Sequence, residues 1–101
     1  MAEPFDIDLL DDDDPFEIDR QAAHLFKHPN LGIDDLYDVW RSEPLFYPAK
    51  PPARWLMVAE IAGRMLVVPL APPDSGDASK CRPIGCYVAA EHLAARYRED
   101  R

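Results

Sequence analysis

The chain has 101 residues, a length typical of one domain, and 48% of them are hydrophobic, which is enough for one core. Its longest apolar runs, 55–59 and 65–71, are too short to span a bilayer, and Met1–Asp6 lacks the basic and apolar stretches of a signal peptide. These features predict a cytoplasmic protein with no membrane partner.

The formal charge of −8 is concentrated in the N-terminal fifth of the chain. Residues 1–20 carry nine acids and one base, whereas residues 21–101 carry ten of each. Proteins that bind nucleic acid through its phosphates are normally basic, so this composition counts against simple RNA binding but leaves room for a local basic site. We expect residues 1–14 to form an acidic, disordered leader and residues 15–101 to form the domain.

An alternative for the leader is that it packs against a basic surface, its own or a partner's. Its apolar residues would help it to dock, and these are Phe5, Ile7, Leu9 and Leu10.

The first half of the domain predicts a short strand followed by two helices. Apolar and polar residues alternate over Phe16–Ile18, which favours a strand. Asp19 suits the N-cap of a helix over about 20–28, and the turn residues at 29–32 end it. A second helix begins at Asp34 and follows the helical period to Trp40.

The second half predicts strands and a closing helix. Residues 45–47 are expected to be extended, and two apolar runs, 55–61 and 64–70, flank Ala62-Gly63 in the clearest β-hairpin signal of the chain. A fourth strand is expected over 82–88. A C-terminal helix follows, with an apolar stripe of Leu93, Ala94 and Tyr97. This order predicts an α+β domain: a small antiparallel sheet centred on the hairpin, with two N-terminal helices and one C-terminal helix.

Metal or disulfide chemistry is not favoured by the cysteines and histidines. Cys81 and Cys86 fall in one predicted strand, where a disulfide would strain the backbone, so we expect ordinary buried thiols. His24 and His28 could share one helix face, but with the cysteines they match known zinc spacings only loosely. We therefore predict no metal and no cofactor.

Four strings follow one another along the chain in a familiar order. They are Phe16-Glu17-Ile18-Asp19 before a helix ending in Lys27-His28, Ile33-Asp34-Asp35 before Val39-Trp40, the strand string at 63–68 (Gly-Arg-Met-Leu-Val-Val), and Arg82-Pro83-Ile84 before a helix with Arg96-Tyr97. Together they resemble the BrnT family of bacterial toxins over about residues 15–99.

That resemblance implies a RelE-like fold, metal-independent RNA cleavage and an antitoxin partner in a type II toxin–antitoxin system. The chain departs from the family pattern at three positions. Pro29 stands where the family has glycine after Lys-His, Gly85 where it has serine, and Tyr87 where it has a second arginine.

RNA cleavage without a metal needs a base, an acid and positive charge on the phosphorane. His28 can serve as base or acid, Arg64 and Arg82 can clamp a phosphate with their planar forks, and Tyr97 can donate a hydrogen bond. These four are the predicted catalytic residues. The predicted substrate-binding residues are Lys27 and Tyr87, since a tyrosine can stack on a base.

Each of these residues also has an ordinary structural interpretation. Lys27 and His28 suit a helix C-terminus, and the two arginines can pair with Glu60, Asp77 or the leader. Tyr97 lies on an apolar stripe that is typical of a core, and Trp40 and Trp55 are assigned to the core.

Two classes of function follow. The first is a BrnT-like endoribonuclease toxin neutralised by an antitoxin, and the strings around Lys27-His28 and Arg82-Pro83-Ile84 favour it. The second is a non-catalytic interaction protein on the same fold, whose Asp11–Asp14 segment enters the basic groove of a host protein. The neutral charge of residues 21–101 favours the second. If Lys27, His28, Arg64 and Arg82 converged on one face, the leader would compete with RNA for it.

Overall fold

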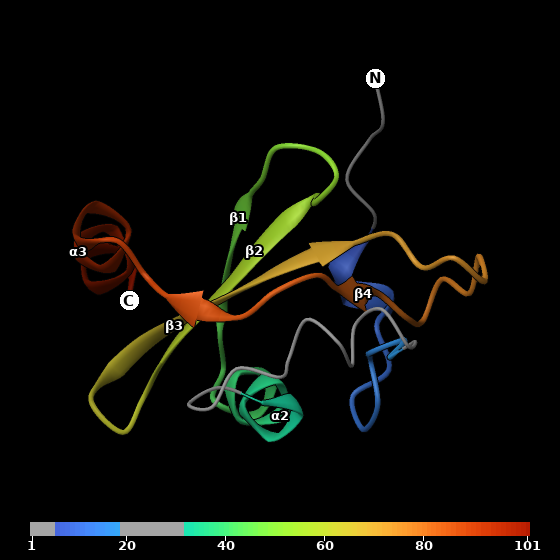
Figure 1. The fold of residues 1–101 in the computed structure, drawn as a ribbon, viewed down its shortest axis with the longest axis horizontal. Coiled ribbons are helices and arrows are strands. Elements are labelled where there is room, and N and C mark those ends of the chain that lie inside the picture. The colour runs from blue at the N-terminus through green and yellow to red at the C-terminus, as the bar shows by residue number, and fades with distance from the viewer. Residues whose placement is uncertain (1–5, 19–31) are drawn as a thin grey trace.

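The computed structural model describes residues 6–18 and 32–101, and an antiparallel sheet forms its centre (Figure 1). The strand order is β1-β2-β3-β4, and β5 also pairs with β3. The strands are β1 Leu45–Pro48, β2 Trp55–Ile61, β3 Arg64–Ala71, β4 Arg82–Pro83 and β5 Tyr87–Val88. The helices are the 3-10 turn η1 Ile7–Leu9, α2 Ile33–Arg41 and α3 Glu91–Asp100. The predicted α+β class with an antiparallel sheet is confirmed, while the helix predicted over 20–28 lies outside the described residues.

The β2–β3 hairpin is the centre of the sheet, as predicted. Its register runs without interruption from Trp55↔Leu70 to Ile61↔Arg64. The two turn residues, Ala62 and Gly63, have φ of 51° and 81°, in the left-handed region that two-residue hairpins require. Gly63 adopts this conformation without steric cost, which is why the glycine signals the turn in the sequence.

The single strand predicted over 82–88 is instead two short strands separated by a bulge. β4 pairs with β3 through Leu70↔Pro83, whereas β5 pairs through Val67↔Tyr87, so two residues of β3 face three residues at 84–86. One of those two is Pro69, which has no amide to donate, although its carbonyl accepts the Ile84 amide at 3.0 Å. The extra residue and the missing donor interrupt the ladder there.

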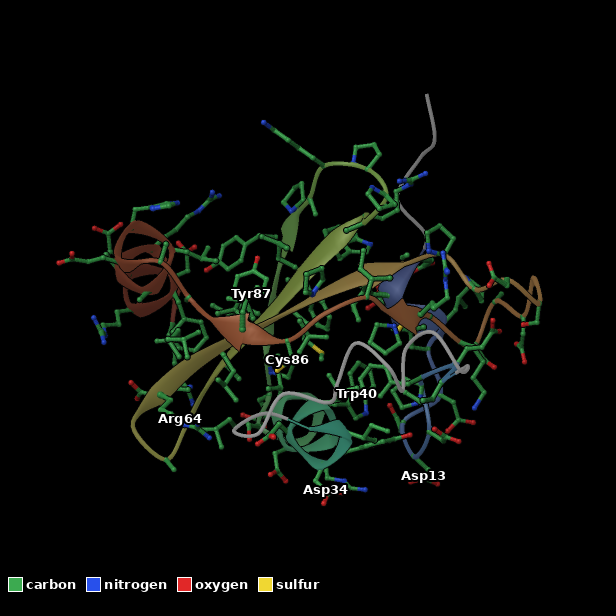
Figure 2. The ribbon with its side chains drawn as sticks, in the orientation of Figure 1. Asp13, Asp34, Trp40, Arg64, Cys86 and Tyr87 are labelled. Atoms are coloured by element: carbon green, nitrogen blue, oxygen red, sulfur yellow. The ribbon has the colours of Figure 1, made fainter. Side chains whose placement is uncertain are left out.

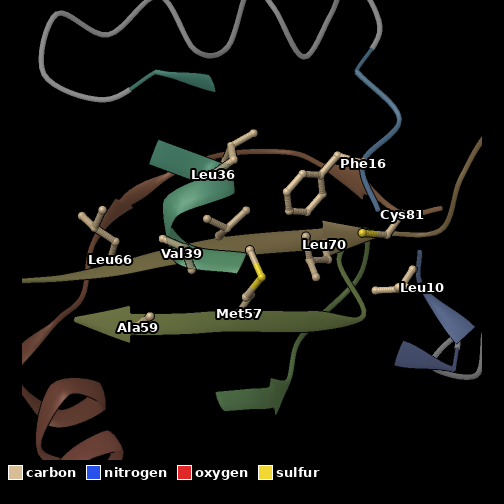
Figure 3. Close-up of a cluster of buried hydrophobic side chains, with 10 residues drawn as sticks. Leu10, Phe16, Leu36, Val39, Met57, Ala59, Leu66, Leu70 and Cys81 are labelled. Atoms are coloured by element: carbon tan, nitrogen blue, oxygen red, sulfur yellow. The ribbon is translucent and has the colours of Figure 1, made fainter. Parts of the chain in front are cut away.

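The two helices cover opposite faces of the sheet. Alternate residues of each strand point to opposite faces, so Met57 and Ala59 face α2, while Val58 faces α3. Leu36 and Val39 of α2 lie over the first face and are fully buried (Figure 3). Ala94 and Tyr97 of α3 lie over the second, as the predicted apolar stripe requires.

The N-terminal segment packs beside β4. The predicted strand at 16–18 is reduced to one parallel bridge between Phe16 and Cys81. The Glu17 amide donates to the Cys81 carbonyl at 2.7 Å, and the Cys81 amide donates to the Pro15 carbonyl at 2.8 Å. Within the predicted leader, Leu10 is 6% exposed, so part of this segment lies against the domain. Its disorder in solution stays a prediction.

Both cysteines are free thiols; Cys81 is buried, as predicted, whereas Cys86 is half-buried. Cys81 is fully buried, and burial raises its pKa to about 12, so it behaves as a small apolar residue of the core. Trp40 and Trp55, which were assigned to the core, are partly buried and pack against it.

Candidate functional site

The two predicted catalytic arginines lie at opposite ends of the sheet. Arg64 is the first residue of β3, beside the hairpin turn, whereas Arg82 pairs with Ala71, the last residue of β3. At about 3.3 Å per residue, their backbones are about 23 Å apart. One phosphate therefore cannot contact both guanidinium groups. Lys27 and His28 lie outside the described residues.

The two predicted tyrosines lie apart as well. Tyr97 is 2% exposed beneath α3, and its hydroxyl accepts a hydrogen bond from Arg101 Nη1, so it is a core residue of the α3 face. Tyr87 is 44% exposed on β5 and lies on the opposite side of that strand from Cys86 (Figure 2). The predicted site residues that the structure describes thus do not form one centre.

Arg64 lies on the side of β3 that faces α2, because it alternates along the strand with Leu66 and Val68 of the α2 face. Burial, with a smaller contribution from Asp35, raises the pKa of the Cys86 thiol to about 11, and Arg64 opposes this shift. Arg64 is exposed, so a cation is present on this side of the hairpin.

Arg82 is engaged by the loop that precedes its strand. Its Nη1 lies 3.6 Å from Asp74 Oδ2, rather than pairing with Glu60 or Asp77 as the sequence suggested. Glu17 anchors the same loop, because its carboxylate accepts the Asp74 amide at 2.9 Å and the Ser75 hydroxyl at 2.5 Å. The hydrogen bond from Ser75 is the main reason that the pKa of Glu17 is lowered.

Two side chains of α2 hold the acidic segment 11–14 in place. The Trp40 Nε1–H donates to the Asp12 carbonyl at 2.9 Å, and the Tyr37 hydroxyl donates to Asp14 Oδ1 at 2.8 Å. On the other side of the segment, Asp14 Oδ2 lies 3.5 Å from Lys80 Nζ. Segment 11–14 therefore runs alongside α2 in a defined position.

The rings of Tyr37 and Trp40 belong to a cluster of four aromatic side chains that fixes their positions. The Phe16 ring is 4% exposed and meets Tyr37 edge-on at 5.2 Å and Trp40 at 6.1 Å. Trp40 in turn meets Phe46 of β1 at 6.4 Å. Edge-to-face contacts of this kind fix ring orientation, and so they direct the polar atoms of Tyr37 and Trp40 toward segment 11–14.

The result is a surface of exposed carboxylates that we call the acidic face. Figure 2 shows Asp13 and Asp34 on the same outer side of the molecule. The exposed carboxylates of the acidic face are those of Asp11, Asp12, Asp13, Asp14, Asp34 and Asp38. Segment 11–14 and α2 together contain seven aspartates and one arginine, a net charge of −6.

A shallow hollow of about 370 Å³ lies on the acidic face. It is lined by Asp34, Tyr37, Asp38 and Arg41, which follow one face of α2, and the Arg41 guanidinium lies 5.5 Å from the centre of the Tyr37 ring. Burial, followed by the hydrogen bond to Asp14, raises the pKa of Tyr37 to about 12. This tyrosine therefore stays a neutral hydrogen-bond donor at physiological pH.

The aspartates do not form a metal site. Across residues 6–18 and 32–101, no three histidine, cysteine, aspartate or glutamate side chains are grouped so as to hold a metal ion. Neither helix of the described part is long and apolar enough to cross a membrane.

Sequence reasoning missed Tyr37 and Trp40 as partners of the leader. Their spacing of three residues is visible in the sequence and places the two side chains next to each other on the surface of one helix. No local signal identified the backbone carbonyl and carboxylate, more than 20 residues away, that they bind.

Comparison of the chain with models of protein families finds no match, and the same is true of comparison with curated proteins and with solved structures.

Proposed function

We propose that this protein acts by binding a basic region of a protein partner through its acidic face, as a non-catalytic interaction or inhibitor protein. One observation carries the proposal: Trp40 and Tyr37 fix Asp12 and Asp14 beside α2, so that carboxylates from two distant segments form one surface. The separation of Arg64 from Arg82 supports the same interpretation, because the described residues offer no composite cleavage centre.

The physical advantage of such a surface is preorganisation. A free acidic tail must lose backbone entropy when it binds, whereas segment 11–14 is already positioned by hydrogen bonds. Clustered carboxylates also attract a basic partner over a distance set by the Debye length, about 8 Å at physiological ionic strength. We therefore expect association that is fast at low salt and slows as salt rises.

The test compares two triple variants that remove the same charge from different faces. Asp12→Asn/Asp13→Asn/Asp38→Asn changes the net charge of segment 11–14 and α2 from −6 to −3, and Glu60→Gln/Glu91→Gln/Glu99→Gln removes three exposed acids from β2 and α3. The probe is a short peptide rich in arginine and lysine. Its binding is followed by calorimetry and by chemical shifts of labelled protein.

We expect the aspartate triple to weaken binding about tenfold at low salt, or about 1.4 kcal/mol, and the glutamate triple to change it less than twofold. Shifts should concentrate at residues 11–14 and 34–41. Equal weakening by both triples would show that net charge alone drives binding, and the acidic face would then have no role as a site.

A BrnT-like ribonuclease toxin neutralised by an antitoxin is the second candidate. It is favoured by the element order after residue 32, a helix, an antiparallel sheet and a closing helix, which agrees with the order that the resemblance implies. The exposed Arg64 on the α2 side of the hairpin gives this candidate a cation for phosphate. A fold hosts many functions, so the order of elements alone does not establish cleavage.

Growth and cleavage assays separate the two candidates. A toxin should arrest growth on expression, and His28→Ala/Arg82→Ala should relieve the arrest. Removing residues 1–14 would change the net charge from −8 to −1, but it would also delete the buried Leu10 and the contacts of Asp12 and Asp14. Asp11→Asn/Asp13→Asn is the cleaner way to test whether the leader suppresses RNA binding. Harmless expression with intact RNA would remove the ribonuclease candidate.

A further inference from the structure

Two arginines flank the C-terminal end of β3 from its two sides. The Arg54 amide donates to the Leu70 carbonyl at 2.7 Å, just before β2 begins. Arg82 pairs with Ala71 from β4. Since neighbouring strands lie about 4.8 Å apart, the two backbones are separated by about 10 Å. Two arginine side chains can meet across that distance at a common ligand.

Both arginines have an Nε–H group without a hydrogen-bond partner. Within residues 6–18 and 32–101, the buried side-chain nitrogen or oxygen atoms without a hydrogen-bond partner are Arg54 Nε and Arg82 Nε. The hydrogen bonds of Arg54 and the ion pair of Arg82 are made by Nη1. Arg54 Nη1 donates to the carbonyls of Pro52 at 3.2 Å and Ala53 at 3.1 Å, and Arg82 Nη1 faces Asp74.

The Nε–H group belongs to the edge of the guanidinium group that suits an oxyanion. Nε–H and the adjacent Nη2–H of an arginine point in parallel and bind two oxygens of a phosphate or carboxylate at once. Buried donors in folded proteins are normally satisfied, so two such atoms on residues that flank the end of β3 indicate an acceptor that the described chain does not supply.

The acids nearby do not fill this role. Glu17 lies close enough to Arg82 for the arginine to lower its pKa, but its carboxylate is already bound by Asp74 and Ser75 of the loop. Asp74 lies 3.6 Å from Arg82 Nη1, and its side chain is 64% exposed. No carboxylate of the described residues lies within ion-pair distance of Arg54.

We propose that Arg54 and Arg82 form a binding site for a tetrahedral oxyanion of the phosphate class, at the end of β3. The anion accepts hydrogen bonds from the Nε–Nη2 edges of both arginines, and Asp74 competes with it for Arg82. The phosphate is either a free ion or a phosphate of an RNA backbone. This site is separate from the acidic face, and neither proposal depends on the other.

The experiment follows the arginine Nε–Hε resonances of ¹⁵N-labelled protein during a titration with inorganic phosphate at constant ionic strength. We expect the signals of Arg54 and Arg82 to shift in a saturable manner, while that of the exposed Arg41 does not. Arg54→Lys and Arg82→Lys keep the charge but lose the fork, and each should weaken phosphate binding about tenfold. Arg41→Lys is the matched control and should leave binding unchanged.

Two further measurements sharpen the result. Asp74→Asn removes the competing carboxylate and should strengthen phosphate binding several-fold without loss of the fold. A short single-stranded RNA that binds through Arg54 and Arg82 more tightly than phosphate, with a steep salt dependence, would identify an RNA phosphate as the ligand; equal or weaker binding would identify the free ion. Shifts that are absent, or that are the same for Arg41 as for Arg54 and Arg82, would overturn the site. So would lysine variants that fold normally and bind phosphate as the wild type does.

Discussion

The two faces of the sheet are covered in different ways. The α2 face buries a cluster of ten residues that joins the helix, the hairpin and the N-terminal segment, among them Leu36, Leu66 and Phe16. The α3 face buries a cluster of six, and polar contacts in the last turns of α3 complete its attachment. There the Tyr47 hydroxyl donates to Asp100 Oδ2 at 2.9 Å, and the Arg96 guanidinium lies 4.8 Å from the centre of the Tyr47 ring.

This difference shows which part of the molecule is a rigid platform. Burial of aliphatic surface depends little on salt or pH, so α2 holds the acidic face in a fixed place under most conditions. Contacts between exposed charges are screened by salt, and the Arg96–Asp100 ion pair of α3 is of this type. Mutations, pH and salt should therefore affect the two faces unequally.

The largest effect is expected from the core of the α2 face. Leu36 is fully buried, and Leu36→Ala should lower the free energy of unfolding by about 2–5 kcal/mol, because it removes apolar contacts and leaves a cavity. Leu93→Ala on the partly buried side of α3 should cost only about 1 kcal/mol. Urea unfolding of both variants checks the comparison. Equal losses would mean that the two helices are anchored equally.

A smaller effect is expected where α2 holds the leader. Trp40→Phe keeps the aromatic contacts but removes the hydrogen bond to the Asp12 carbonyl, at a cost of about 1 kcal/mol. Hydrogen exchange of the Asp11 amide, which donates to the Ser79 carbonyl at 2.9 Å, should accelerate in this variant. The Arg54 amide serves as the internal control and should exchange as before. A wild-type Asp11 amide that already exchanges at the unprotected rate would show that the leader is disordered in solution.

Alkaline pH should reveal the contribution of Tyr37. Its pKa is raised from 10.0 to about 12 in the folded protein, so the unfolded chain ionises first. The stabilisation is complete below about pH 10 and is lost as pH rises from 10 to 12. Tyr37→Phe should make the free energy of unfolding fall less steeply over this interval, and at neutral pH it should cost less than about 1 kcal/mol. Denaturant titrations at several pH values measure both quantities, and an unchanged slope would contradict the assignment.

The smallest effect is expected at the exposed ion pair of α3. Arg96 Nε lies 3.7 Å from Asp100 Oδ2 and both side chains are largely exposed, so Arg96→Gln should cost about 0.5 kcal/mol at low salt. The difference from wild type should shrink in high salt, as thermal unfolding at two salt concentrations will show. A loss that does not change with salt would place the contribution of Arg96 in its packing on Tyr47.

The two predicted catalytic arginines lie apart for a reason that the predicted topology already contained. Arg64 and Arg82 were each identified as the first residue of a strand. When two such strands pair antiparallel, their first residues lie at opposite ends of the pair, and the structure has this arrangement through Ala71↔Arg82. Tyr97 was placed on an apolar stripe, and its burial follows from that stripe rather than from a catalytic role. The positions of Lys27 and His28 stay predictions.

The sequence by itself determined the elements whose signals are local. The glycine of the Ala62-Gly63 turn defined the central hairpin, and apolar periodicity defined α2 and α3, because turn geometry and helical spacing act over a few neighbouring residues. Only the tertiary structure decided that Pro69 would interrupt the edge strand and that Leu10 would be buried. It also decided that Trp40 would bind the Asp12 carbonyl across 28 residues. Such contacts form when distant segments pack together, and charge and periodicity along the chain do not encode which partners then meet.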